Sequence, residues 1–308
     1  SAASDVYKRQ GRGNVRMKHL LDFQDVNKNH LENLIEESRS LKIKSKNLDT
    51  LALLKFDEPS TRTRLSFAIA AEKLGIKTFE SSDVISAKQK GEMLQHELET
   101  YISMGIEILV LRTKENNIND YREFKEIGII SGGFGNKSHP TQALIDISTL
   151  YSFDKLTDTS TPVTYVGDVK HSRVFESGRQ LLNLLGYKVG VFTDQNLLPD
   201  NKNDLEIYES WDEVFENSNS IELLRVQKER MLDIEKINFD NYIKDYQLTK
   251  KILDKSQKDL IVLHPMPINI GIEISEDAIE DKKIKYIDQL SHAIPSRIAA
   301  YKYVKGEI

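Results

Sequence analysis

The chain has 308 residues, of which 39% are hydrophobic and 30% charged, and its net charge is −5. This length accommodates two domains of ordinary size, and the composition is typical of a soluble globular protein. No apolar run approaches the ~20 residues of a membrane span, and no apolar core of a secretory signal is found near the N-terminus. The negative charge argues against general binding to nucleic acid. Because the chain has no cysteine, disulfides and thiolate metal sites are excluded, which fits a cytoplasmic protein.

Apolar periodicity in the first half of the chain predicts alternating helices and strands. The predicted elements are a helix near 29–41, a strand at 51–56, a helix at 61–74 closed by Gly75, a polar stretch at 81–91, a helix near 92–103 and a strand at 106–111. Residues 128–137 form a short apolar piece and a glycine-rich turn, and a further helix opens near His139. Residues 1–16 lack this periodicity, so we expect a disordered or non-native extension before Met17.

A polar linker at 154–161 leads into a second series of strands and helices. Strands are predicted at 163–166, 187–193, 219–224 and 259–263, with a helix over 173–185 and a last helix near 289–304. The lysine-rich run at 242–258 is interpreted as solvated surface. Such alternation is typical of parallel sheets, so the predicted fold class is α/β, with two domains that are each a mainly parallel sheet flanked by helices.

The most informative segment, residues 56–67, joins the strand at 51–56 to the helix at 61–74 and reads FDEPSTRTRLSF. It brings three hydroxyls, from Ser60, Thr61 and Thr63, to a helix N-terminus, where free N–H groups and the helix dipole favour an anion. Arg62 adds a planar fork for two phosphate oxygens, so the segment predicts a phosphate site. The alternative is an ordinary capping turn with a solvated arginine, although a cap needs only one hydroxyl.

Three further blocks each follow a predicted strand, which is where sites lie in parallel α/β folds. They are His139-Pro140-Thr141-Gln142, Arg225-Val226-Gln227-Lys228-Glu229-Arg230 and His264-Pro265-Met266-Pro267. Together with residues 56–67, and in this order, the blocks resemble those of the aspartate and ornithine carbamoyltransferases. The resemblance covers about residues 17–305 and implies an enzyme that transfers a carbamoyl group from carbamoyl phosphate to an amine.

Carbamoyl transfer requires that phosphate be held, that the carbonyl oxyanion be stabilised and that the amine be unprotonated. It requires no cofactor and no metal, and the sequence has no His/Asp/Glu cluster at metal-ligand spacing. The resemblance assigns carbamoyl phosphate binding to Ser60, Thr61, Arg62, Thr63, Ser86, Lys90, Arg112, His139, Gln142, Pro265 and Met266. It assigns catalysis to Arg62, Thr63, Arg112, His139 and Gln142. Thr63, Arg112 and His139 would form the oxyanion hole, and the Gln142 amide oxygen would accept from the carbamoyl NH₂ group together with the carbonyls of Pro265 and Met266.

The second half of the chain indicates which amine accepts the carbamoyl group. The resemblance assigns binding of the amino acid to Lys90, Arg173, Arg225 and Gln227. Arg173 would bind the α-carboxylate, and Arg225 and Gln227 would bind a β-carboxylate. Ornithine enzymes typically carry a Ser-Met-Gly motif and two cysteines; this chain has Thr141 and Pro265 at the cysteine positions. The resemblance therefore implies L-aspartate as the acceptor, in an early step of pyrimidine biosynthesis.

The resemblance also implies how the chain is organised. A carbamoyl-phosphate-binding domain would span 17–150 and be completed by a C-terminal helix within 289–308, and an aspartate-binding domain would span 151–288. The enzyme would be a homotrimer with shared active sites, since the loop carrying Ser86 and Lys90 reaches into the neighbouring subunit, and additional regulatory chains are compatible with it. Glu58 and Arg230 match a pair that links the closed domains, and the family would make 242–258 part of a mobile loop.

Several positions depart from the family pattern. Phe134 stands where many relatives have an acid, Ile268 and Ile270 replace an arginine, and 290–293 interrupt a glycine-rich stretch. The nearest rival function is carbamoylation of another amine, such as ornithine or an acylated ornithine. A non-catalytic anion-binding scaffold would be expected to lose the catalytic side chains, which are present. A Rossmann dehydrogenase is disfavoured because no Gly-x-Gly-x-x-Gly follows a predicted strand.

Overall fold

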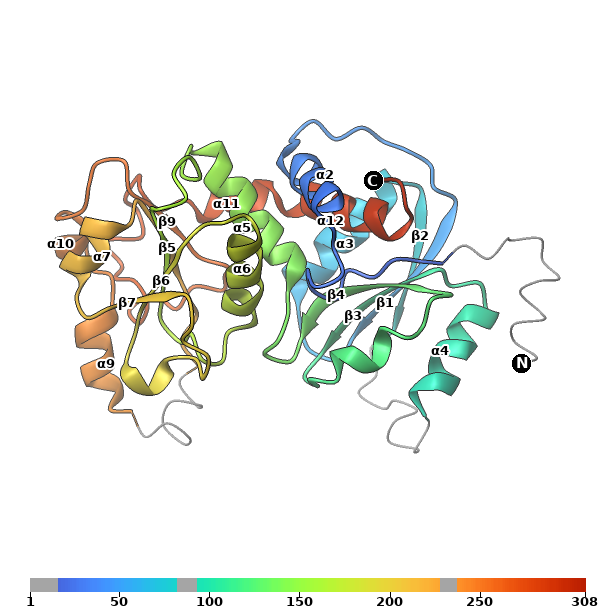
Figure 1. Cartoon of the computed structure of the whole chain (residues 1–308), viewed down its shortest axis with the longest axis horizontal. Coiled ribbons are helices and arrows are strands. Elements are labelled where there is room, and N and C mark those ends of the chain that lie inside the picture. The colour runs from blue at the N-terminus through green and yellow to red at the C-terminus, as the bar shows by residue number, and fades with distance from the viewer. Residues whose placement is uncertain (1–15, 82–92, 228–236) are drawn as a thin grey trace. The chain divides into compact units, whose positions relative to one another are not determined.

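The computed structural model describes residues 16–81, 93–227 and 237–308 (Figure 1). These residues form two compact units: unit 1 contains residues up to 141 together with 293–308, and unit 2 contains 142–292. Each unit is built on one sheet in which neighbouring strands of the described ranges run parallel. The predicted fold class, two parallel-sheet units flanked by helices, is confirmed.

Unit 1 has the strand order β2-β1-β3-β4. Its elements are α2 (Lys28–Arg39), β1 (Thr50–Phe56), α3 (Thr61–Lys73), β2 (Ile76–Ser81), α4 (Leu94–Ser103), β3 (Ile108–Thr113), η2 (Ile118–Tyr121), β4 (Gly128–Phe134), the first residues of α5 (Pro140–Ser152) and α12 (Ala293–Val304). Strands β1, β3 and β4 are buried almost throughout because helices cover both faces of the sheet. Gly75, at a φ of 62°, follows the C-cap of α3 and turns the chain into β2.

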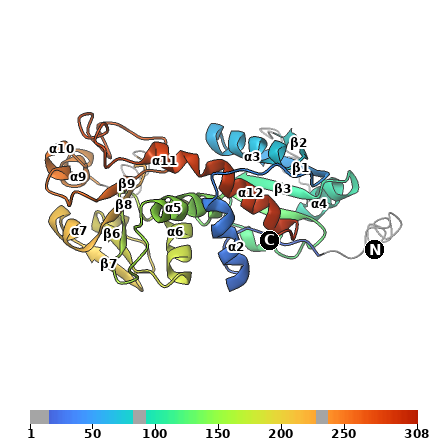
Figure 2. The same ribbon diagram turned by 90° about the horizontal axis from the view of Figure 1, so that it is seen from above.

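Helix α12 brings the end of the chain back to the start of unit 1. It packs on α2 and α3 and against β4, and Figures 1 and 2 both show it beside α2. The Tyr301 hydroxyl donates to the Phe67 carbonyl oxygen at 3.2 Å, and the two rings pack edge to face. The last helix, expected near 289–304, is α12, which ends at Val304 but begins only at Ala293. The residues before it form the separate helix α11 (Tyr286–Ser291), with His292 between the two.

Unit 2 has the strand order β7-β6-β5-β8-β9. Its remaining elements are β5 (Val163–Val166), α6 (Arg173–Leu184), β6 (Val189–Phe192), η3 (Gln195–Leu197), β7 (Leu205–Tyr208), α7 (Trp211–Asn217), β8 (Ser220–Leu223), α9 (Phe239–Tyr246), α10 (Lys250–Leu253), β9 (Ile261–Leu263) and α11. Figure 1 shows α5 and α6 on one face of this sheet and α7, α9 and α10 on the other. Sequence periodicity did not predict β7 or α7.

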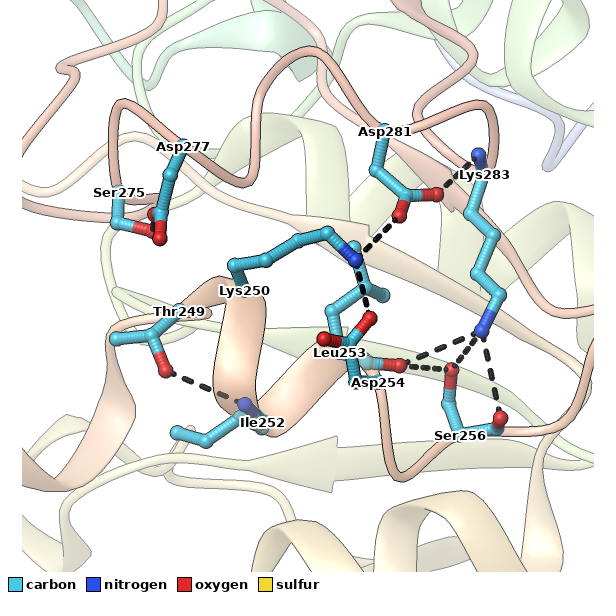
Figure 3. Close-up of polar contacts among 10 residues, drawn as sticks. All are labelled: Thr249, Lys250, Ile252, Leu253, Asp254, Ser256, Ser275, Asp277, Asp281 and Lys283. Carbon is cyan, nitrogen blue, oxygen red and sulfur yellow. Dashed lines mark hydrogen bonds and ion pairs between the residues drawn. The ribbon is translucent and has the colours of Figure 1, made fainter.

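The lysine-rich run at 242–258 is ordered structure rather than solvated surface throughout. It contains most of α9 and all of α10, and Tyr242, Leu248 and Leu253 are buried. Figure 3 shows how the end of α10 is held: the Lys283 Nζ donates to the carbonyl oxygens of Leu253 and Ser256, each at 3.3 Å, and lies 2.7 Å from the Ser256 hydroxyl. The buried side chains of Tyr242, Leu248 and Leu253 thus hold in place a segment whose composition is mostly polar.

Helices that could cross a membrane are not found in the part of the chain that the structure describes, since none is both long and apolar enough.

Candidate active site

The residues expected to bind phosphate lie at the carboxyl edge of the unit 1 sheet. Strand β1 lies between β2 and β3. The chain adds β2 on one side of β1 and then β3 and β4 on the other side, so the switch point of the sheet lies between β1 and β3. Loops diverge at such a switch point and leave room for a ligand beyond the strand ends. Residues 57–63 follow β1, and Arg112 pairs with Phe56 across the last register position of β1 and β3. The sheet thus brings two segments fifty residues apart to one place.

The start of α3 has the properties of an anion site. Ser60 is the N-cap residue, with extended backbone, yet its side chain makes no capping hydrogen bond among the residues described. Thr61 and Arg62 are exposed, whereas Thr63 is buried in the first turn. The alternative of an ordinary Ser capping turn is therefore not what this helix start shows, and its first N–H groups face the same edge as the hydroxyls.

Arg112 is held in place from two sides within unit 1. Its Nη1 donates to the Gly132 carbonyl oxygen at 3.2 Å, and its Nε lies 3.4 Å from the Glu58 carboxylate. The backbone N–H of Asp57 donates to the Arg112 carbonyl oxygen at 2.9 Å, which ties the loop after β1 to β3. The sequence placed Arg112 directly after a strand; the structure places it within β3, one residue before the strand ends.

His139 comes from a tight turn that follows β4. The Phe134 N–H donates to the Ser138 carbonyl oxygen at 2.9 Å, and the Ser138 hydroxyl donates to the Leu21 carbonyl oxygen at 2.5 Å. The imidazole of His139 is buried, directly before the first residue of α5. Phe134, one of the departures from the family pattern, is fully buried and packs edge to face on Tyr121, so it fills the core beneath this turn.

Gln142 and the turn at 264–267 belong to unit 2. The Gln142 Nε2 donates to Asp146 Oδ1 at 2.9 Å, one turn further along α5. Pro265 and Met266 follow β9, and Met266 adopts a left-handed φ of 59° before a cis peptide bond to Pro267. His264 is buried, and its Nδ1 accepts the Met266 N–H at 2.8 Å. The turn is thus fixed by its own histidine, a role that sequence reasoning did not assign.

Three of the residues expected to bind aspartate, Arg173, Arg225 and Gln227, follow β5 and β8, the strands that border the switch point of the unit 2 sheet. Arg173 begins α6 after the loop that follows β5, and Arg225 and Gln227 come directly after β8. Buried Asp168 contacts the His171 Nδ1 at 2.9 Å and so holds the loop before Arg173. Arg225 is exposed, which leaves its guanidinium accessible to an anion.

Close approach of the two loops at this switch point requires a glycine. Gly167 has a φ of 126°, and a Cβ at this position would lie 2.8 Å from the Leu224 carbonyl oxygen. The Leu224 N–H in turn donates to the Val166 carbonyl oxygen at 2.8 Å. The backbone of the β5 loop can therefore lie against the segment that carries Arg225.

The other residues singled out in the sequence fall in two groups. Ser86, Lys90 and Arg230 lie outside the described residues. Ile268 is partly buried against the main apolar core of unit 2, and Ile270 is 55% exposed.

Across residues 16–81, 93–227 and 237–308, no group of three or more His, Asp or Glu side chains could hold a metal ion. Asp146 and Gln289, which support Gln142 and the 264–267 turn, were missed; the spacing of Gln142 and Asp146, one helical turn, was the available signal.

Both halves of the chain match models of known protein domains. Residues 18–152 match the model of the aspartate/ornithine carbamoyltransferase carbamoyl-P binding domain, and residues 159–304 match that of the Asp/Orn binding domain. The chain therefore belongs to the aspartate/ornithine carbamoyltransferase family.

Individual relatives cover nearly the whole chain. The aspartate carbamoyltransferase catalytic subunit of Aquifex aeolicus is 32% identical over 295 residues, which are 94% of this chain and 99% of that protein. The corresponding subunit of Fusobacterium nucleatum is 33% identical over 302 residues, covering 95% and 97%. Among solved structures, the catalytic subunit of M. jannaschii aspartate transcarbamoylase has a TM-score of 0.79 at 28% identity, covering 94% of this chain and 99% of that one.

A structure of ornithine carbamoyltransferase from Pyrococcus furiosus has a TM-score of 0.81 at 21% identity and covers 96% of this chain and 99% of that one. At that identity the likeness concerns the fold alone. The choice of amine is therefore to be sought in side chains at the unit 2 switch point rather than in the backbone.

Proposed function

We propose that this chain transfers the carbamoyl group of carbamoyl phosphate to the amino group of L-aspartate, giving N-carbamoyl-L-aspartate and phosphate. The observation that carries the proposal is the presence of arginines at both switch points: Arg62 and Arg112 in unit 1, and Arg173 and Arg225 in unit 2. One pair suits a phosphate, and the other suits a dicarboxylate. The aspartate carbamoyltransferase relatives at 32–33% identity support the same reaction.

In the proposed reaction, the unprotonated amine nitrogen attacks the carbonyl carbon of carbamoyl phosphate. The bond from this carbon to the phosphate oxygen breaks, phosphate leaves with the electron pair, and the amine proton passes to the departing phosphate. Thr63, Arg112 and His139 donate to the carbonyl oxygen as negative charge develops on it. Loss of one such donor typically costs about 3–4 kcal/mol of transition-state stabilisation. Ser60, Thr61 and Arg62 hold the phosphate, and no cofactor or metal is part of the proposal.

Specificity for aspartate is assigned to three side chains. Arg173 binds the α-carboxylate, while Arg225 and Gln227 bind the β-carboxylate. Ornithine presents an ammonium group where aspartate presents this second carboxylate, so Arg225 would repel it. The same side chains that attract a dicarboxylate therefore reject the principal rival.

The proposal extends to domains, assembly and location. Residues 17–150 with 289–308 would bind carbamoyl phosphate, and 151–288 would bind aspartate. Three chains would form a closed ring in which Ser86 and Lys90 of one subunit enter the site of the next. Family resemblance supports these points, together with a cytoplasmic location and a place early in pyrimidine biosynthesis; it leaves room for regulatory chains.

The proposed function is tested by measuring both products with the purified chain. Phosphate and N-carbamoyl-L-aspartate should form in equal amounts from carbamoyl phosphate and L-aspartate, in the presence of a chelator. Arg62→Ala and His139→Ala should each lower kcat by orders of magnitude while the unfolding midpoint stays near that of the unaltered chain. Preferred carbamoylation of ornithine, or full activity of either variant, would reject the assignment.

A further inference from the structure

A chain of hydrogen bonds inside unit 2 joins Gln142 to the turn at 264–266. Asp146 Oδ1 accepts from the Gln142 Nε2 at 2.9 Å and from the Gln289 Nε2 at 2.7 Å. The Gln289 Oε1 in turn accepts the His264 backbone N–H at 3.0 Å. Asp146 is 1% exposed and Gln289 is 2% exposed, so the connection is shielded from water. Gln142 and Gln289, which lie far apart in the sequence, thus share one carboxylate oxygen.

The direction of each hydrogen bond in this chain follows from the chemistry of its end groups. The His264 backbone N–H can only donate, so the Gln289 oxygen must face it and the Gln289 NH₂ group must face Asp146. An ionised carboxylate can only accept, so Gln142 must also turn its NH₂ group toward Asp146. The amide oxygen of Gln142 is then on the opposite side, available to accept a hydrogen bond from a ligand.

A second set of contacts holds the turn. The His264 Nε2 lies 3.0 Å from the Glu273 carboxylate, and the His264 Nδ1 accepts the Met266 N–H. The Glu273 carboxylate also accepts the Asn269 N–H at 3.1 Å. Because the turn's N–H groups are occupied inside, the carbonyl oxygens of Pro265 and Met266 are the groups it can offer a ligand.

A second acid, Glu222, lies beside Asp146 in this buried place. Glu222, on β8, is fully buried, and burial raises its pKa well above the ordinary value; the neighbouring Asp146 carboxylate and a hydrogen bond with it raise the pKa further. The other titratable group beside the pair is Tyr165 on β5, whose pKa is raised well above its usual range by burial and by both acids. The Glu222 carboxyl therefore favours its protonated, neutral form, so that Asp146 does not face a second buried charge.

We propose that Asp146 is a positioning residue that orients both halves of the carbamoyl NH₂ subsite, the Gln142 amide oxygen directly and the Pro265 and Met266 carbonyls through Gln289. The proposal rests on the proposed function, which places the carbamoyl NH₂ group between these acceptors. One carboxylate then sets the spacing of acceptors that come from opposite ends of unit 2.

The test compares carbamoyl phosphate with acetyl phosphate, in which a methyl group replaces NH₂ and cannot donate. The readout is the ratio of kcat/KM for the two substrates, because the intrinsic difference in their reactivity is the same for every variant. Asp146→Leu, similar in volume but without an acceptor, should lower this ratio by about 10- to 100-fold. Asp146→Asn keeps an acceptor oxygen toward Gln142 and Gln289 and should retain the ratio within about threefold.

If Asp146→Leu does not fold, a second pair of variants provides the test. Gln289→Met removes the link to His264 and should lower the ratio in the same direction. The matched control is Gln257→Met, since Gln257 is another unit 2 glutamine whose Nε2 donates to a backbone carbonyl, that of Phe215. The control should leave the ratio unchanged, whatever it does to stability.

An equal loss of activity toward both substrates, in a folded Asp146→Leu or Gln289→Met variant, would mean a purely structural role and would overturn the proposal. Failure of the proposed function is separately visible, because the unaltered chain would then make no N-carbamoyl-L-aspartate. In that event the dissociation constants of carbamoyl phosphate and acetyl phosphate are measured by calorimetry without an amine. Their ratio replaces the ratio of kcat/KM and tests the role of Asp146 by itself.

Discussion

His19 is a buried histidine whose hydrogen bond depends on its charge state. Its Nδ1 accepts the Ile129 N–H at 3.2 Å, so a proton on this nitrogen would break the contact. Burial, which is the largest cause, and the nearby cations Lys125 and Arg122 together lower the pKa of His19 to about 4. The folded chain therefore keeps a neutral imidazole where an exposed one would take a proton.

We predict that His19 contributes to acid destabilisation between pH 6.5 and pH 4. In this window the unfolded chain binds a proton that the folded chain does not, so the free energy of unfolding falls as the pH falls, by about 3 kcal/mol at most. His19→Asn keeps an acceptor for the Ile129 N–H without titrating, and should flatten this part of the curve. Urea midpoints at pH 7, 5.5 and 4.5 measure it.

The control is His96→Asn, which replaces an exposed histidine on α4. Its urea midpoints should follow those of the unaltered chain at each pH. If His19→Asn also follows them, the acid sensitivity has another source.

At the unit 2 switch point, we predict that Arg225→Ala weakens aspartate and spares carbamoyl phosphate. The guanidinium is exposed, and its partner in the proposed function is the aspartate β-carboxylate. Loss of that charge partner should raise the KM for aspartate by about 30-fold or more. Arg39→Ala, which removes an exposed arginine from α2, should leave both substrates unaffected. Steady-state kinetics decides, and an equal loss of affinity for carbamoyl phosphate would contradict the two-subsite assignment.

At the scale of elements, the segment formed by α9 and α10 offers a comparison of two lysines. Figure 3 shows the Lys283 side chain directed at the end of α10, where it contacts three oxygens, whereas Lys250 forms ion pairs with Asp254 and Asp281 at its start. The Leu253 carbonyl also accepts from the Ser256 N–H and hydroxyl, so Lys283 adds a charged donor to a helix end that is already partly capped. Ion pairs of partly exposed side chains contribute little by comparison.

We therefore predict that Lys283→Met lowers the free energy of unfolding by about 1–2 kcal/mol. Lys250→Met, the same substitution 33 positions earlier in the chain, should cost clearly less. Urea unfolding of the two variants side by side measures the difference. An equal loss in both would mean that the carbonyl contacts of Lys283 do not stabilise α10.

The elements that the sequence predicted well are those with strong apolar patterns. The strand at 163–166 and the helix from 173 are found where expected, because Val163 and Tyr165 or Phe175 and Leu181 face buried surroundings. Strand β7 was missed because it is a short edge strand and only its last residue is buried. In α9 and α10 the buried residues are too widely spaced among lysines and aspartates to show a helical stripe.

For the site, sequence motifs located the side chains that would touch substrates, since these residues cluster in short blocks. They could not reveal what holds those blocks in place. The contact of Asp146 with Gln289 joins positions 143 apart, and the pairing of Arg112 with Phe56 depends on strand order. Such pairings arise from tertiary packing, which neither periodicity nor local spacing encodes.

At the scale of the whole molecule, we predict that active sites are shared between subunits. Lys90→Ala and Arg225→Ala homotrimers should each be nearly inactive at low aspartate, because each would lack one side of the site. After dissociation, equal mixing and reassembly, about a quarter of interfaces should combine an intact Lys90 with an intact Arg225. Activity should return in that proportion. Mixed trimers, verified by mass, that stay as inactive as their parents would show that Lys90 acts within its own chain.

The return of α12 to unit 1 has a consequence for synthesis on the ribosome. Residues 142–292 are contiguous, so the nascent chain contains all of unit 2 before residues 293–304 have been made. Unit 1 begins first but lacks the helix that covers α2, α3 and β4 until residues 293–304 have been made. Unit 2 can therefore fold before unit 1 is complete, whereas the N-terminal part of a chain usually folds first. Until α12 is made, the surfaces of α2, α3 and β4 that pack on it stay uncovered, and exposed surfaces of this kind are what chaperones bind.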